Sequence, residues 1–205
     1  MSALDASRYP WLDLLHIVNR AVHERNGQSV ASTPPESAQL VAEHPPPGWL
    51  GATGASETEL ARHEERLGVR LPPSYREFLQ VTNGWDKKTY SSLHLLPVAE
   101  LGWTRDVDPY LAEVWGPKPS SPDISDEDYF VYGAGQDPMH IRDEYMPGTL
   151  YISEYLEGQV YLLNPHIVMS DGEWEAWSFA TWKPGVTRFR SFWDLMADEF
   201  RDCTS

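Results

Sequence analysis

The fold is decided by residues 56–85, SETELARHEERLGVRLPPSYREFLQVTNGW, which are predicted to form two short helices joined by a turn. Ser56 and Glu59 have the spacing of a capping box, in which the serine hydroxyl accepts a first-turn N–H and the glutamate reaches back to the cap. The first helix is therefore expected to begin at Glu57. Gly68 is expected to end it, because glycine tolerates the left-handed backbone of a C-terminal stop.

The second helix of this stretch is expected to begin at two adjacent prolines. Pro72 and Pro73 prevent the first helix from continuing, but their fixed φ and missing N–H suit the first turn of a new helix. One face of this helix is predicted to enter a core, and the helix is expected to end at two residues that tolerate positive φ. The face consists of Tyr75, Phe78, Leu79 and Thr82, and the stop consists of Asn83 and Gly84.

The order and spacing of these residues resemble the opening of the Smi1/Knr4, or SUKH, domain. The resemblance rests on Gly54, Ala55, Glu59, Leu60, Glu64, Leu67, Gly68, Leu71, Pro72, Tyr75, Phe78, Leu79, Asn83 and Gly84, and it covers about residues 49–200. It implies an α+β fold with helices packed on a twisted antiparallel sheet. It also implies protein binding, since such domains are often bacterial immunity proteins that block a cognate toxin, and a fungal relative is a cell-wall-signalling scaffold.

The composition predicts a folded and acidic protein. The chain has 205 residues, 41% of them hydrophobic, and nine tryptophans, which is enough to bury a core. Its 16 basic and 31 acidic side chains give a formal net charge of −15. This charge opposes binding to nucleic acid or anionic lipid and attracts a basic protein, although acidity can also serve solubility alone. We expect a protein partner, with a basic toxin domain as one candidate, and no nucleic acid or membrane.

The chain shows no targeting segment. Its N-terminus carries Asp5 and Arg8 and lacks an apolar run followed by a small-residue cleavage site. No apolar stretch approaches the roughly 20 residues that span a bilayer. The single Cys203 cannot form an internal disulfide, which fits the cytosol. A cytoplasmic protein is expected.

The chain divides into an N-terminal helix, a linker and the domain. Residues 1–26 carry an apolar stripe at helical spacing, which must be buried on the domain's own surface or against a partner or second copy. The stripe consists of Trp11, Leu15, Val18 and Val22. Residues 27–48 are rich in proline and are predicted to be a linker. The domain occupies residues 49–205, with an insertion at about 102–126 that is expected to carry one short helix.

Short apolar and β-branched runs predict the strands of the sheet. They lie at residues 93–96, 129–132, 149–153, 159–163 and 173–179. The third and fourth runs form a hairpin that Asn164-Pro165 is expected to close. Residues 173–179 have aromatic side chains on both faces, so this strand is either covered on both sides or offers one face to a partner. A helical turn is expected at residues 98–101, and Ser191 is expected to cap a final helix.

The sequence offers no convincing catalytic set. Its seven histidines are scattered, and none has a two-histidine metal spacing with a third ligand nearby. There is no Gly-x-Ser-x-Gly elbow and no phosphate-binding loop with its lysine. Residues 133–148 contain Asp137, His140, Asp143 and Glu144, which could bind a cation, but a solvated loop is favoured. We expect no catalytic residue, no metal and no cofactor.

The candidate partner-binding residues are acidic and aromatic. The acidic run at residues 126–128 is a solvated charge run, a patch for a basic partner or, least favoured, a metal or acid–base site. Aromatic residues near loops often anchor interfaces, with core packing as the alternative. The candidate set is Trp103, Tyr110, Asp126, Glu127, Asp128 and Trp177.

Three functions are compatible with these features. The first is an immunity protein that occludes a toxin through acidic loop residues and exposed aromatic side chains. The second is a signalling or assembly scaffold that uses the N-terminal helix as its connector. The third is an uncharacterised enzyme that uses acidic residues.

Overall fold

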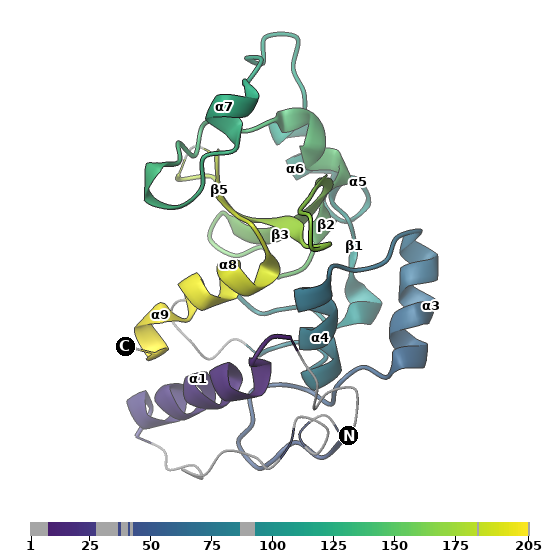
Figure 1. Ribbon diagram of the computed structural model, residues 1–205, viewed down its shortest axis with the longest axis vertical. Coiled ribbons are helices and arrows are strands. Elements are labelled where there is room, and N and C mark those ends of the chain that lie inside the picture. The colour runs from purple at the N-terminus through teal and green to yellow at the C-terminus, as the bar shows by residue number, and fades with distance from the viewer. Residues whose placement is uncertain are drawn as a thin grey trace. The chain divides into compact units, whose positions relative to one another are not determined.

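The computed structural model describes residues 8–27, 37, 41, 43–86, 93–183 and 185–204, which form two compact units (Figure 1). Unit 1 comprises the chain up to Glu100 together with residues 196–205, and unit 2 comprises Leu101–Leu195. Unit 1 is mainly helical, whereas unit 2 contains a five-stranded antiparallel sheet with the order β1-β2-β3-β4-β5. The predicted α+β class with an antiparallel sheet is confirmed.

The two predicted helices of residues 56–85 are present in unit 1 as α3 (Glu57–Leu67) and α4 (Pro73–Val81). The Ser56 hydroxyl accepts the Glu59 N–H at 3.2 Å, as the capping-box spacing predicted. Gly68 ends α3 with φ 73°, and the chain enters α4 through Pro72 in an extended conformation. Local capping chemistry therefore accounts for both helix boundaries.

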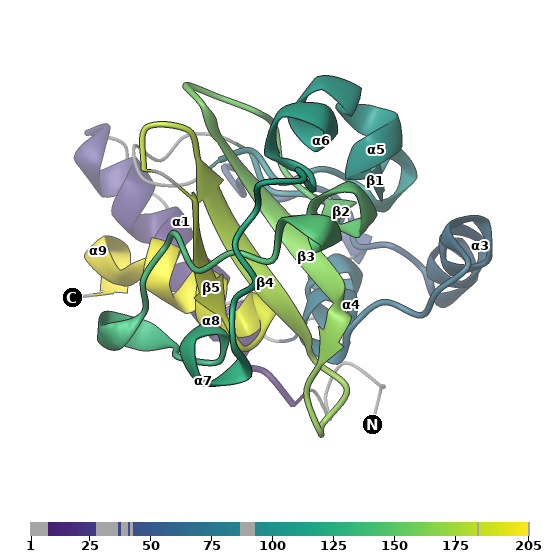
Figure 2. The same ribbon diagram turned by 90° about the horizontal axis from the view of Figure 1, so that it is seen from above.

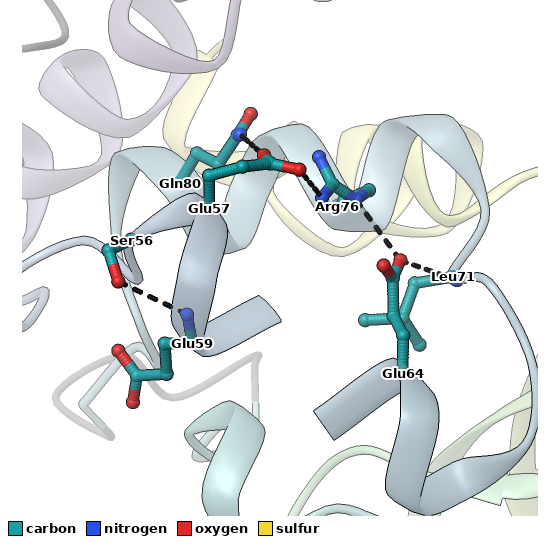
Figure 3. A network of polar contacts seen from close by, with 7 residues as sticks. All are labelled: Ser56, Glu57, Glu59, Glu64, Leu71, Arg76 and Gln80. Carbon is teal, nitrogen blue, oxygen red and sulfur yellow. Dashed lines mark hydrogen bonds and ion pairs between the residues drawn. The ribbon is translucent and has the colours of Figure 1, made fainter. Parts of the chain in front are cut away.

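Arg76 of α4 clamps the two helices together (Figure 3). Its Nε donates to Glu64 Oε1 of α3 at 3.0 Å, and a second guanidinium nitrogen binds Glu57. The same Glu64 oxygen accepts the Leu71 N–H of the turn at 3.0 Å. The side chains of Arg76 and Glu64 are each only 13% exposed, so this ion pair is shielded from solvent.

Replacing Arg76 by methionine is expected to lower the free energy of unfolding by about 1–2 kcal/mol, because the shielded Glu64 carboxylate loses its charged donor. Hydrogen bonding to Arg76 also holds the pKa of Glu57 below its ordinary value of 4.5. A depressed folded-state pKa stabilises the fold above the unfolded pKa, and this stabilisation is lost as pH falls through the folded value. Urea unfolding should therefore show the smallest difference between wild type and Arg76→Met below about pH 4.5.

The exposed Arg62 of α3 offers the matched control for this prediction. Arg62→Met removes the same charge without touching the clamp and should be close to neutral. Equal stability of the two variants at neutral pH would contradict the role of Arg76.

The N-terminal helix, α1 (Trp11–Arg25), packs against α4 and against α9 (Arg201–Thr204) within unit 1. Trp11 Nε1 donates to the Ser74 carbonyl at 2.9 Å, and its ring meets Phe78 edge-on with centroids 5.3 Å apart. The whole predicted stripe is buried. Of the two alternatives for this helix, the structure shows docking on the chain's own surface. Most of the predicted linker, residues 28–36, 38–40 and 42, lies outside the described residues.

The remaining elements of unit 1 are short. Residues 98–100 form the expected helical turn, η2 (Val98–Glu100). The run at residues 93–96 is not a strand, because only Leu95 pairs, through an isolated bridge to Trp85. Helix α8 (Phe192–Glu199) begins in unit 2 and continues into unit 1 at Met196. It begins at the predicted cap, with the Ser191 hydroxyl accepting the Asp194 N–H at 3.0 Å.

The sheet of unit 2 is built on the long antiparallel pairing of its third and fourth strands (Figure 2). Its strands are β1 (Gly102–Trp103), β2 (Leu150–Tyr151), β3 (Gln159–Val168), β4 (Trp174–Ala180) and β5 (Gly185–Phe189). The β2–β3 hairpin is confirmed, but Asn164-Pro165 does not close it, because β3 continues to Val168 through a register shift. Strand β5 was not predicted from the sequence.

Two further expectations for unit 2 are wrong. Residues 129–132 are not a strand, because Ser125 caps a helical turn, α7 (Asp126–Tyr129), and local capping prevails over the β-propensity of an aromatic run. The insertion at 102–126 begins with a strand of the sheet and carries two helices rather than one. These are α5 (Thr104–Val107) and α6 (Pro109–Trp115), and the following loops contain η3 (Gly133–Gly135) and η4 (Asp143–Gly148).

Candidate functional site

The six predicted site residues fall in three separate places of unit 2. The acidic residues 126–128 lie on α7, Trp103 and Tyr110 lie in β1 and α6, and Trp177 lies in the middle of β4. Figure 2 shows α5 and α6 beside β1 and β2 at one end of the sheet, and α7 beyond β5 at the other. The structure therefore brings the three carboxylates together but separates them from Trp103 and Tyr110.

Trp177 is a core residue. Its side chain is fully buried, and its Nε1 donates to Glu175 Oε2 at 2.6 Å. Every residue of β4 is buried, so this strand is covered on both faces. Of the two alternatives for its aromatic side chains, burial on both sides is therefore observed, and not a face offered to a partner. Trp177 therefore cannot contact a partner at the surface of this structure.

The acidic run occupies the first turn of α7, where negative charge is favoured by the helix dipole. All three side chains are exposed. Asp126 binds Arg142, whose guanidinium also donates to the Ile124 carbonyl at 2.9 Å, and Asp128 accepts the Ser125 hydroxyl at 2.8 Å. The described contacts of Asp126 and Asp128 thus serve capping and an ion pair.

A buried carboxylate that was not predicted lies beneath α7. Glu175 of β4 is fully buried and accepts four hydrogen bonds. The donors are Tyr129 Oη at 2.6 Å, Tyr132 Oη at 2.8 Å, Asn164 Nδ2 at 3.1 Å and Trp177 Nε1 at 2.6 Å. Burial, and next the charge and hydrogen bond of Glu175, raise the pKa of both tyrosines, so their hydroxyls stay protonated as donors. The network ties the sequence around α7 to the sheet.

Arg188 of β5 holds the segment that follows α7. Its guanidinium is buried, lies 4.7 Å from the centre of the Tyr129 ring, and donates to the carbonyls of Val131 and His140. Its backbone N–H donates to Gln136 Oε1 at 2.6 Å, and its carbonyl accepts from Gln136 Nε2 at 3.2 Å. The segment from Val131 to His140 therefore covers the outer edge of β5.

The α5–α6 region presents a different surface. Asp108 caps α6 by accepting the Leu111 N–H at 2.9 Å, and Trp115 packs edge-on against Phe179 with ring centroids 4.9 Å apart. Tyr110, 74% exposed, lies on the other side of the helix. Trp103 is half-buried, with the Arg105 guanidinium 5.6 Å from its ring centre. Of the predicted aromatic residues, Tyr110 is thus the one most available to a partner.

A depression of about 440 Å³ on unit 1 does not have the chemistry of a ligand site. It is lined by Glu57, Glu64, Glu65, Gly68, Val69, Arg70 and Arg76. Arg76, Glu57 and Glu64 bind one another in the clamp between α3 and α4 (Figure 3), so they are occupied with holding the helices together.

The loop at residues 133–148, for which cation binding was the less favoured alternative, has no metal-like geometry. His140 Nε2 lies 3.8 Å from Asp137 Oδ2, and Asp143 accepts the Ser121 hydroxyl. Among the residues that the structure describes, no three His, Cys, Asp or Glu side chains are grouped closely enough to hold a metal ion. In the same part of the chain, no helix is long and apolar enough to cross a bilayer.

The comparison with known proteins identifies the family. The curated proteins contain no match to this chain. A family model described as SMI1 / KNR4 family (SUKH-1) matches residues 54–202, well over half of the chain. The chain therefore belongs to the SMI1 / KNR4 family (SUKH-1).

Proposed function

We propose that this protein is a cytoplasmic immunity protein that neutralises a cognate toxin by direct binding. The observation that supports this most is the family match, since domains of this family are in general toxin-immunity and protein-binding modules and are generally not enzymes. The net charge of −15 adds a preference for a basic toxin domain, such as a nuclease, because opposite charge accelerates encounter.

The scaffold alternative is less favoured. It relies on α1 as a connector to another protein, which requires an apolar face that is free to bind. The stripe of Trp11, Leu15, Val18 and Val22 is already buried within unit 1. The enzymatic alternative is also less favoured. It relies on the carboxylates of the acidic run of α7, but Asp126 already binds Arg142 and Asp128 already binds Ser125.

Co-purification with the product of the adjacent upstream gene tests the proposal. We expect a stable complex, and we expect co-expression to rescue cells from growth arrest by that product. Neutralisation should be stoichiometric, with toxin activity falling linearly up to one equivalent and not falling further with longer incubation, because binding and not turnover removes the activity.

The salt dependence of the complex tests the charge of the partner. Raising the ionic strength should slow association more than it speeds dissociation, since screening weakens long-range steering first. Absence of both a complex and growth rescue would overturn the proposed function. If a complex forms at the same rate in low and high salt, the partner is not basic, but the proposed immunity function still stands.

A further inference from the structure

The α5–α6 region exposes apolar side chains that its own packing does not use. Leu111 and Ala112 of α6 are buried, and Trp115 packs on Phe179. Tyr110 and Val114 are four residues apart on the same helix, so they share one face, and they are 74% and 42% exposed.

The end of α5 carries a further exposed apolar side chain. Val107, 44% exposed, is the last residue of α5, and Asp108, with a non-helical φ of −135° and ψ of 77°, separates it from α6. We call Tyr110 and Val114 the α6 face. An exposed valine beside an exposed tyrosine is typical of an interface, in which tyrosine contributes a large rigid contact at little entropic cost.

Acidic side chains border the α6 face. Asp106 and Glu113 are exposed beside it, and Asp108 lies between α5 and α6. Burial, and then the charges of Asp108 and the half-exposed Tyr155, raise the pKa of Tyr151. The one basic residue of α5 and α6, Arg105, lies over the Trp103 ring and beside Asp106. The Lys118 ammonium also lies at the end of α6, where it donates to the Glu113 carbonyl. Three carboxylates, Asp106, Asp108 and Glu113, therefore face two basic side chains, and the border is net negative.

The charge of the border and of the chain decides between the possible occupants. A second copy of this chain would bring two net-negative borders, on chains of −15 each, into contact around the same apolar group. Like charges at the rim of an interface oppose association, whereas a positively charged rim would complement it. Lysine and arginine side chains can also lie along the exposed Tyr110 ring.

We propose that the α6 face is the docking surface of this protein and that its occupant is a basic amphipathic helix of a partner protein. Apolar side chains of that helix pack on Tyr110 and Val114, and its basic side chains meet Asp106 and Glu113. This assignment rests on the proposed protein-binding function, and it makes α7 at the other end of the sheet a separate surface.

The full chain can be tested with a defined probe, a fluorescent amphipathic helical peptide of leucine and lysine, followed by anisotropy. The Tyr110→Ser/Val114→Ser variant should weaken binding at least about tenfold, as expected for loss of a tyrosine-centred contact. The matched control is Val168→Ser/Trp182→Ser, which removes two other exposed apolar side chains of unit 2 and should change the affinity less than about twofold. A leucine and glutamate peptide should not bind.

The charge requirement has its own pair of variants. Asp106→Asn/Glu113→Gln should weaken binding of the lysine peptide and flatten its salt dependence, whereas Asp123→Asn/Glu127→Gln, also exposed, should not. Thermal melting of all variants should match wild type, because the replaced side chains are exposed.

Three results would overturn the assignment. The first is equal loss of peptide binding in the test and control variants. The second is a wild-type dimer by light scattering that the Tyr110→Ser/Val114→Ser variant abolishes, which would identify a second copy as the occupant. The third is a complex with the upstream gene product that forms equally well with wild type and with the Tyr110→Ser/Val114→Ser variant. That result would overturn the assignment of the α6 face but not the proposed function. Failure of that complex and of growth rescue with wild type would instead overturn the proposed function.

Discussion

Replacing Glu175 by alanine is expected to lower the free energy of unfolding by about 3–5 kcal/mol, measured by urea denaturation of the full chain. The substitution removes the only carboxylate seen to accept from Tyr129, Tyr132 and Trp177 in the described residues. It leaves the hydroxyl of Tyr129 and the N–H of Trp177 buried without this acceptor, and the hydroxyl of the half-buried Tyr132 loses it as well. A buried donor that loses its acceptor costs about 1–3 kcal/mol, and removing one member of a buried charged network costs about 3–5 kcal/mol.

Milder variants keep this prediction testable if Glu175→Ala does not fold. Glu175→Gln retains one acceptor oxygen and should cost less than alanine. Tyr132→Phe removes a single hydrogen bond to Glu175 and should cost about 1.5–3 kcal/mol, the usual range for bonds to charged groups. The control, Glu127→Ala, removes an exposed carboxylate and should be nearly neutral. Equal stability of Glu175→Gln, Tyr132→Phe and the control would show that the network does not hold the fold.

Removing residues 1–27 is expected to unfold unit 1, because α1 supplies a row of buried side chains that includes Trp11 and Leu15. A point variant gives the size of the effect. Trp11→Ala should cost about 3–5 kcal/mol, since it empties a buried aromatic site and removes the hydrogen bond to the Ser74 carbonyl. Circular dichroism and urea unfolding measure both changes, and Glu24→Ala, which breaks an exposed ion pair with Arg20 on the same helix, is the control.

A truncated chain that keeps a cooperative unfolding transition and its helical content would contradict this prediction. It would also revive the scaffold alternative, in which α1 connects the domain to another protein. The family match begins at residue 54 and so does not include α1. Removing residues 1–27 and replacing Trp11 by alanine therefore test whether the matched segment can fold without the helix that precedes it.

The helix pair could be predicted because its determinants are local. Ser56, Gly68 and the two prolines act within one or two turns, so their chemistry is legible in the sequence. At residues 129–132 a local determinant was also present in the sequence, because the Ser125 cap starts α7 and prevails over the β-propensity of the aromatic run. Tyr129 and Tyr132 are placed by hydrogen bonds to Glu175, more than forty positions away, and no local pattern encodes such a partner.

The candidate site was predictable in part. The acidity of residues 126–128 could be read directly, whereas Tyr110, expected in or near a loop, lies on α6, and the exposure of a side chain depends on tertiary packing. Trp177 and Tyr110 are both aromatic, yet one is fully buried and the other 74% exposed. A glutamate within an aromatic strand was the available signal for the buried network, since such a carboxylate needs donors when the strand is covered on both faces.

The covered edge of β5 limits how this protein can engage other chains. The backbone N–H groups of Val186 and Arg188 are already bonded to the Pro138 carbonyl and to Gln136. A foreign strand that added to the sheet here would have to displace these bonds and strip the segment from Val131 to His140. The sheet is thereby protected at this edge from growing into fibrillar aggregates.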